Sequence, residues 1–185
     1  MFPVNVIHEK AVAAGLEYLL IGGHALNAYG TPRATLDVDF LVRREDQQRW
    51  RELLSREGFQ LQHDGGNFLQ LSPPYGVEWP LDLMLVAEDS FRKIWADSRE
   101  LSCLGVTTRV PGPLHFIALK LHALTHGPAS RKAKDFGDIL TLSREITSPT
   151  ESAELREIFL KFSNETIYGE FQQALGNPDR PESGS

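Results

Sequence analysis

The stretch that decides the fold of this chain is YLLIGGHALNAYGTPRATLDVDFLV, residues 18–42. It opens with an apolar run of strand length, which the glycine pair Gly22-Gly23 ends. Two adjacent glycines let backbone N–H groups approach a ligand closely. A helix that begins at about His24 would present its positive end to an anion. The stretch therefore predicts a strand, a tight turn, a short helix and a second strand.

The second strand, expected over residues 36–42, carries two carboxylates two positions apart. Side chains alternate between the two faces of a strand, so Asp37 and Asp39 are expected on the same face. The other parity is apolar and is expected to pack inward; it comprises Leu36, Val38, Phe40 and Val42. Two carboxylates on one face suit a divalent cation, although aspartates on the outer face of a strand are usually only solvated. Each feature alone is a weak signal.

A third carboxylate lies in the apolar strand LDLMLV, residues 81–86. The leucines of this strand take one parity and Asp82 takes the other. A charged side chain in so apolar a strand is costly unless it is paired, metal-bound or exposed. Opposed side chains on neighbouring strands lie about 5 Å apart. If the strand lies beside residues 36–42, Asp82 therefore reaches the same place as Asp37 and Asp39. The alternative is an aspartate on an edge strand that faces water.

In this order and at this spacing, the glycine pair and the aspartates resemble the nucleotidyltransferase fold of the DNA polymerase beta superfamily. The string GGHALNAYGTPRATLDVDF is most similar to small bacterial transferases that include the AbiEii-type toxins of toxin–antitoxin pairs. The matching motifs are a glycine pair, an Arg-x-Thr and an Asp-x-Asp, here Gly22-Gly23, Arg33-Ala34-Thr35 and Asp37-Val38-Asp39. The resemblance implies an α+β fold in which helices flank a small mixed sheet, followed by a helical C-terminal part.

The resemblance also implies a Mg²⁺-dependent enzyme that moves a nucleoside monophosphate from a nucleoside triphosphate such as ATP to an acceptor hydroxyl. It assigns two Mg²⁺ ions to Asp37, Asp39 and Asp82, and the substrate phosphates to Gly22, Gly23 and Arg33, with Thr35 either binding the phosphates or bracing the loop. His24 follows the glycine pair directly, so it is a candidate for a phosphate contact or, as an N-terminal residue of the helix, for a supporting position behind the residues that touch the phosphates.

The resemblance to the toxin group implies tRNA as the acceptor, whereas other members of the superfamily modify antibiotics or proteins. A cognate antitoxin is an implied partner. The alternative is a catalytically silent nucleotide-binding or antitoxin-like protein of the same fold.

From Pro113 onward the sequence predicts only helices, the first over residues 113–126 and the second over residues 131–145. A lysine that precedes a Lys-Asp-x-x-Asp resembles later motifs of the same family. On that resemblance Lys120 is a catalytic and triphosphate-binding candidate, and the supporting candidates are Asp135, Asp138 and Arg131. Without it, Lys120 is a lysine at the margin of a buried stripe, and Asp135 is a partner for nearby basic groups.

The segment between the two aspartate strands predicts an amphipathic helix over residues 45–57 and a hairpin over residues 59–71. The hairpin turns at Asp64-Gly65-Gly66. Residues 72–80 contain three prolines and a glycine and are expected to form a loop. The length and mixed polarity of this loop would suit a lip on the active site, or equally a plain connection.

The 185 residues carry a formal net charge of −6, which argues weakly against broad nucleic-acid binding. We expect a core over residues 1–112, a helical region over residues 113–176 and a disordered tail over residues 177–185. No apolar run reaches the roughly 18 residues of a membrane span, and the N-terminus lacks the pattern of a signal peptide. The single cysteine, Cys103, excludes an intramolecular disulfide. The sequence therefore favours a cytoplasmic protein without a membrane partner.

Overall fold

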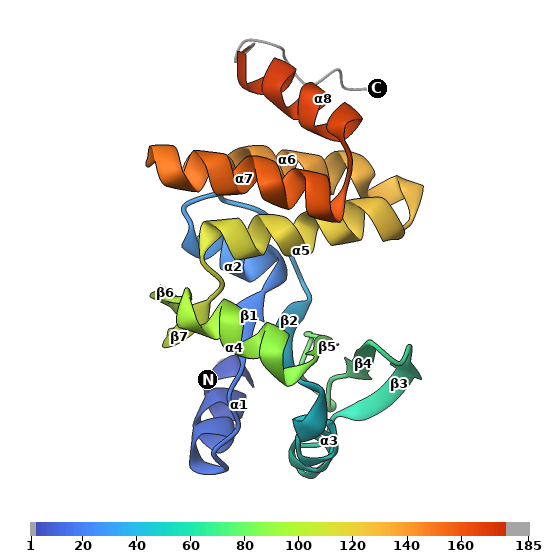
Figure 1. The fold of residues 1–185 in the computed structure, drawn as a ribbon. Helices are drawn as coiled ribbons and strands as arrows, with labels where there is room; N and C mark the ends of the chain where they lie inside the picture. The colour runs from blue at the N-terminus through green and yellow to red at the C-terminus, as the bar shows by residue number, and fades with distance from the viewer. Residues whose placement is uncertain (1–2, 177–185) are drawn as a thin grey trace. The chain divides into compact units, whose positions relative to one another are not determined.

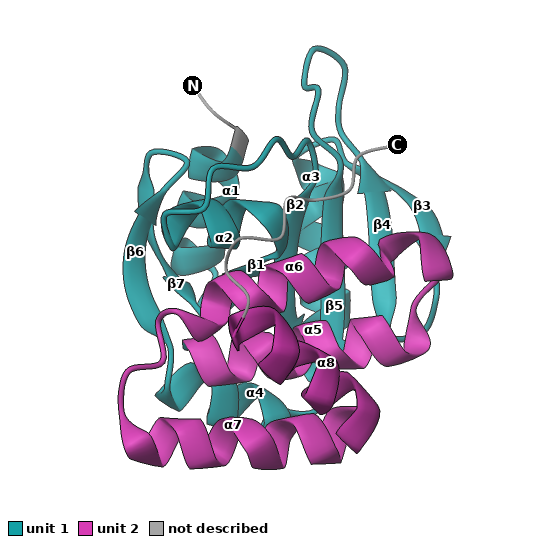
Figure 2. Ribbon diagram, turned by 90° about the horizontal axis from the view of Figure 1, so that it is seen from above, with its two compact units in different colours: residues 1–112 teal, residues 113–185 magenta. Residues whose placement is uncertain are grey.

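The computed structural model describes residues 3–176 of the chain. Contacts divide the chain into two compact units, Met1–Gly112 and Pro113–Ser185, drawn in teal and magenta in Figure 2. The tail predicted to be disordered, residues 177–185, lies outside the described residues. Within the described range, no helix has both the length and the apolar character needed to cross a membrane.

A mixed five-stranded sheet forms the centre of the first unit, with its strands in the order β1-β2-β5-β4-β3 (Figure 1). The strands are β1 Leu19–Ile21, β2 Val38–Arg43, β3 Gln60–Asp64, β4 Phe68–Ser72 and β5 Leu81–Val86. β2 and β5 run parallel, and the other neighbouring pairs are antiparallel. The predicted α+β class is confirmed.

Helices cover this sheet, and a two-stranded hairpin completes the unit. The elements are α1 Pro3–Ala13, α2 Gly22–Ala28, η1 Arg44–Asp46, α3 Gln47–Arg56, α4 Glu88–Ala96, β6 Arg99–Cys103 and β7 Val106–Val110. α2 contacts β1, β2 and β6, while α4 contacts β2. In the core, Tyr18 stacks on Phe40 with ring centroids 4.1 Å apart, and Trp50 meets Tyr18 edge-on. Burial of these large rings anchors β1 and β2 to the helices.

β2 begins at Val38, so the strand predicted from residue 36 starts too early. The Val38 N–H donates to the Pro80 carbonyl at 3.0 Å, and Val38 stands opposite Leu81. The next bond of the parallel ladder would need an N–H at residue 80, which proline lacks. Leu36 is consequently 70% exposed instead of packed inward. Asp37 lies in the connection before the strand and not on the strand itself.

The second unit is entirely helical over its described residues. It contains α5 Pro113–His126, η2 Ala129–Arg131, α6 Lys132–Ser143, α7 Pro149–Phe162 and α8 Glu165–Gly176. α5 packs against α6 and α7, and α8 packs against the same two helices. The apolar residues Phe136, Ile139 and Leu140 are the buried positions that the sequence of α6 predicts. Ile139 is buried, but Phe136 and Leu140 are only half-buried, while Asp135 and Asp138 are buried.

Candidate functional site

Asp39 and Asp82 form the centre of the candidate site. The register of the parallel pair β2 and β5 places Asp39 directly opposite Asp82. Opposed residues project from the same face of a sheet and lie close together, and both aspartates are half-buried. The structure therefore confirms that the two strands that carry Asp39 and Asp82 lie side by side.

The glycine pair lies against this centre. Ile21, the last residue of β1, stands opposite Asp39. Gly22 follows with φ +68°, and a Cβ atom at this position would overlap the Asp39 carboxylate. A Cβ atom at Gly23 would lie 2.8 Å from Thr35 Oγ1. Glycine is needed at both positions, because only a residue without a side chain lets the first turn of α2 approach Asp39 and Thr35 so closely.

The Arg33-Ala34-Thr35 segment is fixed by Asn27, a residue that the sequence interpretation did not single out. The Asn27 side chain accepts a hydrogen bond from the Arg33 N–H at 2.7 Å. Its amide nitrogen donates to the Arg33 carbonyl at 3.0 Å. Asn27 lies on α2, so these two bonds tie the Arg-x-Thr backbone to the helix that follows the glycine pair.

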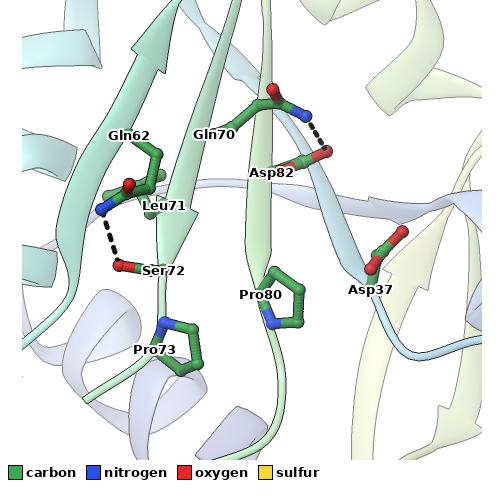
Figure 3. Close-up of a pocket in the computed structure, with 8 residues that line it drawn as sticks. All are labelled: Asp37, Gln62, Gln70, Leu71, Ser72, Pro73, Pro80 and Asp82. Carbon is green, nitrogen blue, oxygen red and sulfur yellow. Dashed lines mark hydrogen bonds between the residues drawn. The ribbon is translucent and has the colours of Figure 1, made fainter.

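A groove of about 320 Å³ opens beside Asp82 (Figure 3). Eight residues line it: Asp37, Gln62, Gln70, Leu71, Ser72, Pro73, Pro80 and Asp82. The two prolines come from the 72–80 loop, which therefore borders the groove, as a lip would. The polar side chains of the β3–β4 hairpin that line the groove, Gln62, Gln70 and Ser72, are not among the predicted site residues. The signal for Gln70 and Ser72 was available in FLQLS, residues 68–72, where polar residues alternate with leucines.

The three predicted metal ligands do not form one preformed cluster. Across residues 3–176, no group of three or more Asp, Glu, His or Cys side chains is arranged to hold a metal ion. Asp37 shares the groove with Asp82, whereas Asp39 matches Asp82 in register and lies against Gly22. Magnesium prefers one or two carboxylates together with phosphate and water oxygens. The acids therefore fit a metal site that substrate phosphates complete, and not an all-protein cage.

His24 is buried and lies flat on Trp79, with ring centroids 5.2 Å apart and an interplanar angle of 9°. Burial lowers the pKa of the imidazole below its usual value, and the negative charge of Asp37 opposes part of this shift. Within the described chain, His24 Nε2 has no hydrogen-bond partner. At neutral pH the ring is therefore uncharged and would offer a phosphate a hydrogen bond at most, not a full positive charge.

Replacing His24 by phenylalanine should flatten the pH dependence of stability. The pKa of an unfolded histidine is about 6.5, and the folded value is lower. The unfolded chain therefore binds the proton first as the pH falls, so the folded wild type loses stability below about pH 6.5. Urea unfolding at pH 8 and pH 5 should show a larger loss for the wild type than for His24→Phe. Equal losses would contradict this assignment.

In the second unit, Lys120 lies in a buried cluster of charges. Its Nζ atom is 3.1 Å from Asp135 Oδ1 and 2.6 Å from Asp138 Oδ2, and all three residues are buried. Arg131 is exposed at the end of η2. The cluster joins α5 to α6 and explains why two aspartates occupy inward positions of α6. The roles of these four residues toward a triphosphate stay predictions.

Replacing Lys120 by methionine should lower the free energy of unfolding by about 3–5 kcal/mol, because two buried carboxylates would lose their shared cation. The matched control is Lys134→Met, which removes an exposed lysine of α6 and should change stability by no more than about 0.5 kcal/mol. Urea unfolding measures both values. A loss no larger than that of the control would show that the cluster contributes little.

The architecture is that of the nucleotidyltransferase fold, as solved structures show. The antibiotic-resistance factor ANT(2'')-Ia matches with a TM-score of 0.66 and 14% identity, over 94% of this chain and 95% of that one. A nucleotidyltransferase-like protein from Paracoccidioides brasiliensis matches with a TM-score of 0.57 and 18% identity, over 94% and 86%. The lincosamide antibiotic adenylyltransferase LnuA matches with a TM-score of 0.55 and 16% identity, over 78% and 96%.

At these identities the likeness concerns the fold alone. Neither the comparison with protein-family models nor the comparison with curated protein sequences gives a match. The AbiEii-type resemblance of the Gly22–Asp39 segment therefore stays a prediction, while the wider nucleotidyltransferase fold is confirmed.

Proposed function

We propose that this protein transfers a nucleoside monophosphate from a nucleoside triphosphate to a hydroxyl group of an acceptor. The observation that carries the proposal is the pairing of Asp39 with Asp82 in register, beside the Gly22-Gly23 bend. This arrangement lies in a nucleotidyltransferase fold. Two of the similar structures point to the same chemistry: one holds adenylyl-2''-tobramycin, and the other is a lincosamide adenylyltransferase.

The residues that would hold Mg²⁺ are Asp37, Asp39 and Asp82, with substrate phosphates as the remaining ligands. Neighbouring carboxylates repel one another unless a cation neutralises them. A bound metal ion would therefore remove the repulsion among these aspartates. When bound, two Mg²⁺ ions would neutralise both the carboxylates and the charge that develops on the triphosphate.

The protein groups then have separate tasks. The acceptor oxygen forms a bond to the α-phosphorus, the bond from that phosphorus to the bridging oxygen breaks, and pyrophosphate leaves. The acceptor hydroxyl gives its proton to a carboxylate oxygen of Asp82, which faces the groove. The backbone N–H groups of Gly22 and Gly23 bind the departing phosphates, and Arg33 opposes their charge. Thr35 packs against Gly23 and braces that turn.

The proposal is tested by incubating the protein with Mg²⁺ and each ribonucleoside triphosphate labelled at the α-phosphorus. Total RNA, cellular protein and small hydroxylated molecules serve in turn as acceptors. Transfer of label, with one pyrophosphate released for each label transferred, is the expected result. Asp82→Asn should remove this transfer. Tight nucleotide binding without transfer to any acceptor would instead indicate a catalytically silent nucleotide-binding protein.

A further inference from the structure

We propose that the last turn of α5 carries a binding site for a transition-metal dication such as Zn²⁺, with His122 and His126 as its two protein ligands. The site belongs to the second unit and uses imidazole nitrogens. It therefore differs in chemistry from the proposed Mg²⁺ site of the aspartates, and it does not depend on nucleotidyl transfer.

The two histidines share one face of α5, the helix labelled in Figure 1. They stand four residues apart in HALTH, residues 122–126. Residues at this spacing lie one above the other on the same side of an α-helix. Both histidines are exposed, whereas the neighbouring Leu121 and Leu124 are buried. The leucines thus pack the helix into its bundle, and the histidine face stays accessible to an ion.

The two imidazole rings are close enough to share one ion. Their centroids lie 4.3 Å apart, with an interplanar angle of 30°. Each nitrogen that binds Zn²⁺ lies about 2.0–2.1 Å from it, so two ligating nitrogens can be no more than about 4 Å apart. Since both side chains are exposed, rotation about their own bonds is enough to bring two ring nitrogens to this distance.

A hydrogen bond within the turn leaves the outer nitrogen of His126 available to a metal. His126 Nδ1 lies 3.0 Å from the carbonyl oxygen of His122. A carbonyl only accepts hydrogen bonds, so Nδ1 carries the proton and Nε2 keeps its lone pair. Metal-binding histidines commonly donate their second ring N–H to a carbonyl or a carboxylate, which fixes the orientation of the ring. His126 therefore already has the tautomer that ligation through Nε2 requires.

The end of the helix favours a cation, and the ligand type selects its class. His126 is the last residue of α5, and the carbonyl groups at a helix C-terminus carry partial negative charge. Imidazole suits Zn²⁺, Cu²⁺ and Ni²⁺, whereas Mg²⁺ and Ca²⁺ prefer oxygen ligands. Over residues 3–176, no third His, Cys, Asp or Glu completes a metal-binding group. Water would therefore fill the remaining positions, as in sites that keep positions open to outside ligands.

Binding is tested by titrating the full chain, without nucleotide, with Zn²⁺ and separately with Mg²⁺. Calorimetry gives the affinity, and the nitrogen chemical shifts of the imidazole rings identify the residues that bind. We expect the signals of His122 and His126 to shift together as Zn²⁺ is added and to stay unchanged with Mg²⁺. No shift of either ring with Zn²⁺, or a shift of one ring alone, would overturn the proposal.

Replacing either histidine should disrupt the site. His122→Gln and His126→Gln should each weaken Zn²⁺ binding at this turn by at least as much as the loss of an outer-shell partner does, about tenfold or more. The matched control His63→Gln removes an exposed histidine of β3 and should leave the affinity unchanged. An affinity of His122→Gln equal to that of the control would contradict the assignment.

Thermal unfolding gives an independent readout, because an ion that binds the folded chain raises its Tm. Added Zn²⁺ should raise the Tm of the wild type and of His63→Gln more than that of His122→Gln or His126→Gln. An equal rise in all four proteins would place the bound Zn²⁺ elsewhere and would overturn the proposal.

Discussion

Replacing Asp39 by asparagine is expected to reduce nucleotidyl transfer on the order of a thousandfold while leaving the fold intact. Asparagine keeps the shape of the side chain that lies against Gly22, but it removes the negative charge. Asp39 stands opposite Asp82, so the loss falls at the centre of the proposed metal and phosphate site. Initial rates with a labelled triphosphate measure the effect, and thermal unfolding checks that the variant is folded.

The matched control is Asp89→Asn, which makes the same chemical change at an exposed position in the first turn of α4. This control should retain the wild-type rate. If Asp39→Asn turned over as fast as the control, the assignment of Asp39 to the reaction would be wrong, whatever the fold.

Replacing Gly22 by alanine is expected to cost about 2–5 kcal/mol of folding stability and to abolish transfer. Two causes add. Gly22 has φ +68°, a backbone conformation in which a side chain costs about 1–2 kcal/mol. The new methyl group would also overlap the Asp39 carboxylate, and forcing it aside costs a further 1–3 kcal/mol, roughly. The displaced carboxylate would no longer face Asp82 correctly.

Gly15→Ala separates the two causes. Gly15 has φ +62°, close to that of Gly22, but no atom lies within 4 Å of the position of its Cβ. The control should therefore lose only about 1–2 kcal/mol and keep its activity. Urea unfolding gives both free energies, and their difference isolates the contact between residue 22 and Asp39. Equal losses for the two variants would mean that this contact is easily relieved.

Much of the site-bearing fold could be predicted from the sequence because local patterns and tertiary packing agree there. The alternating leucines of LDLMLV gave β5 its observed bounds, Leu81–Val86. The proline at Pro113 and the stripe that follows gave α5 its observed bounds, Pro113–His126. The glycine pair predicted a tight turn after the first strand, and Gly22 follows β1 with φ +68°. In each case a residue type that is typical of a strand, a helix start or a turn stands where the structure has that element.

The wrong or missing predictions concern features that depend on residues distant in the sequence. The alternation of apolar residues continues back to Leu36, but the partner strand offers Pro80 there, so the ladder stops. Lys120 and Asp135 are charged, and only their pairing across α5 and α6 makes their burial tolerable. The groove depends on the pairing of β3 with β4 and of β4 with β5, and no local pattern specifies all of these registers.

The most direct test of nucleotidyl transfer compares two labels on the same nucleoside triphosphate. With label at the α-phosphorus, the account predicts a labelled acceptor. With label at the γ-phosphorus, it predicts an unlabelled acceptor and labelled pyrophosphate in equal amount. Label from the γ-phosphorus on the acceptor, or a triphosphate that stays intact with every acceptor, would contradict it.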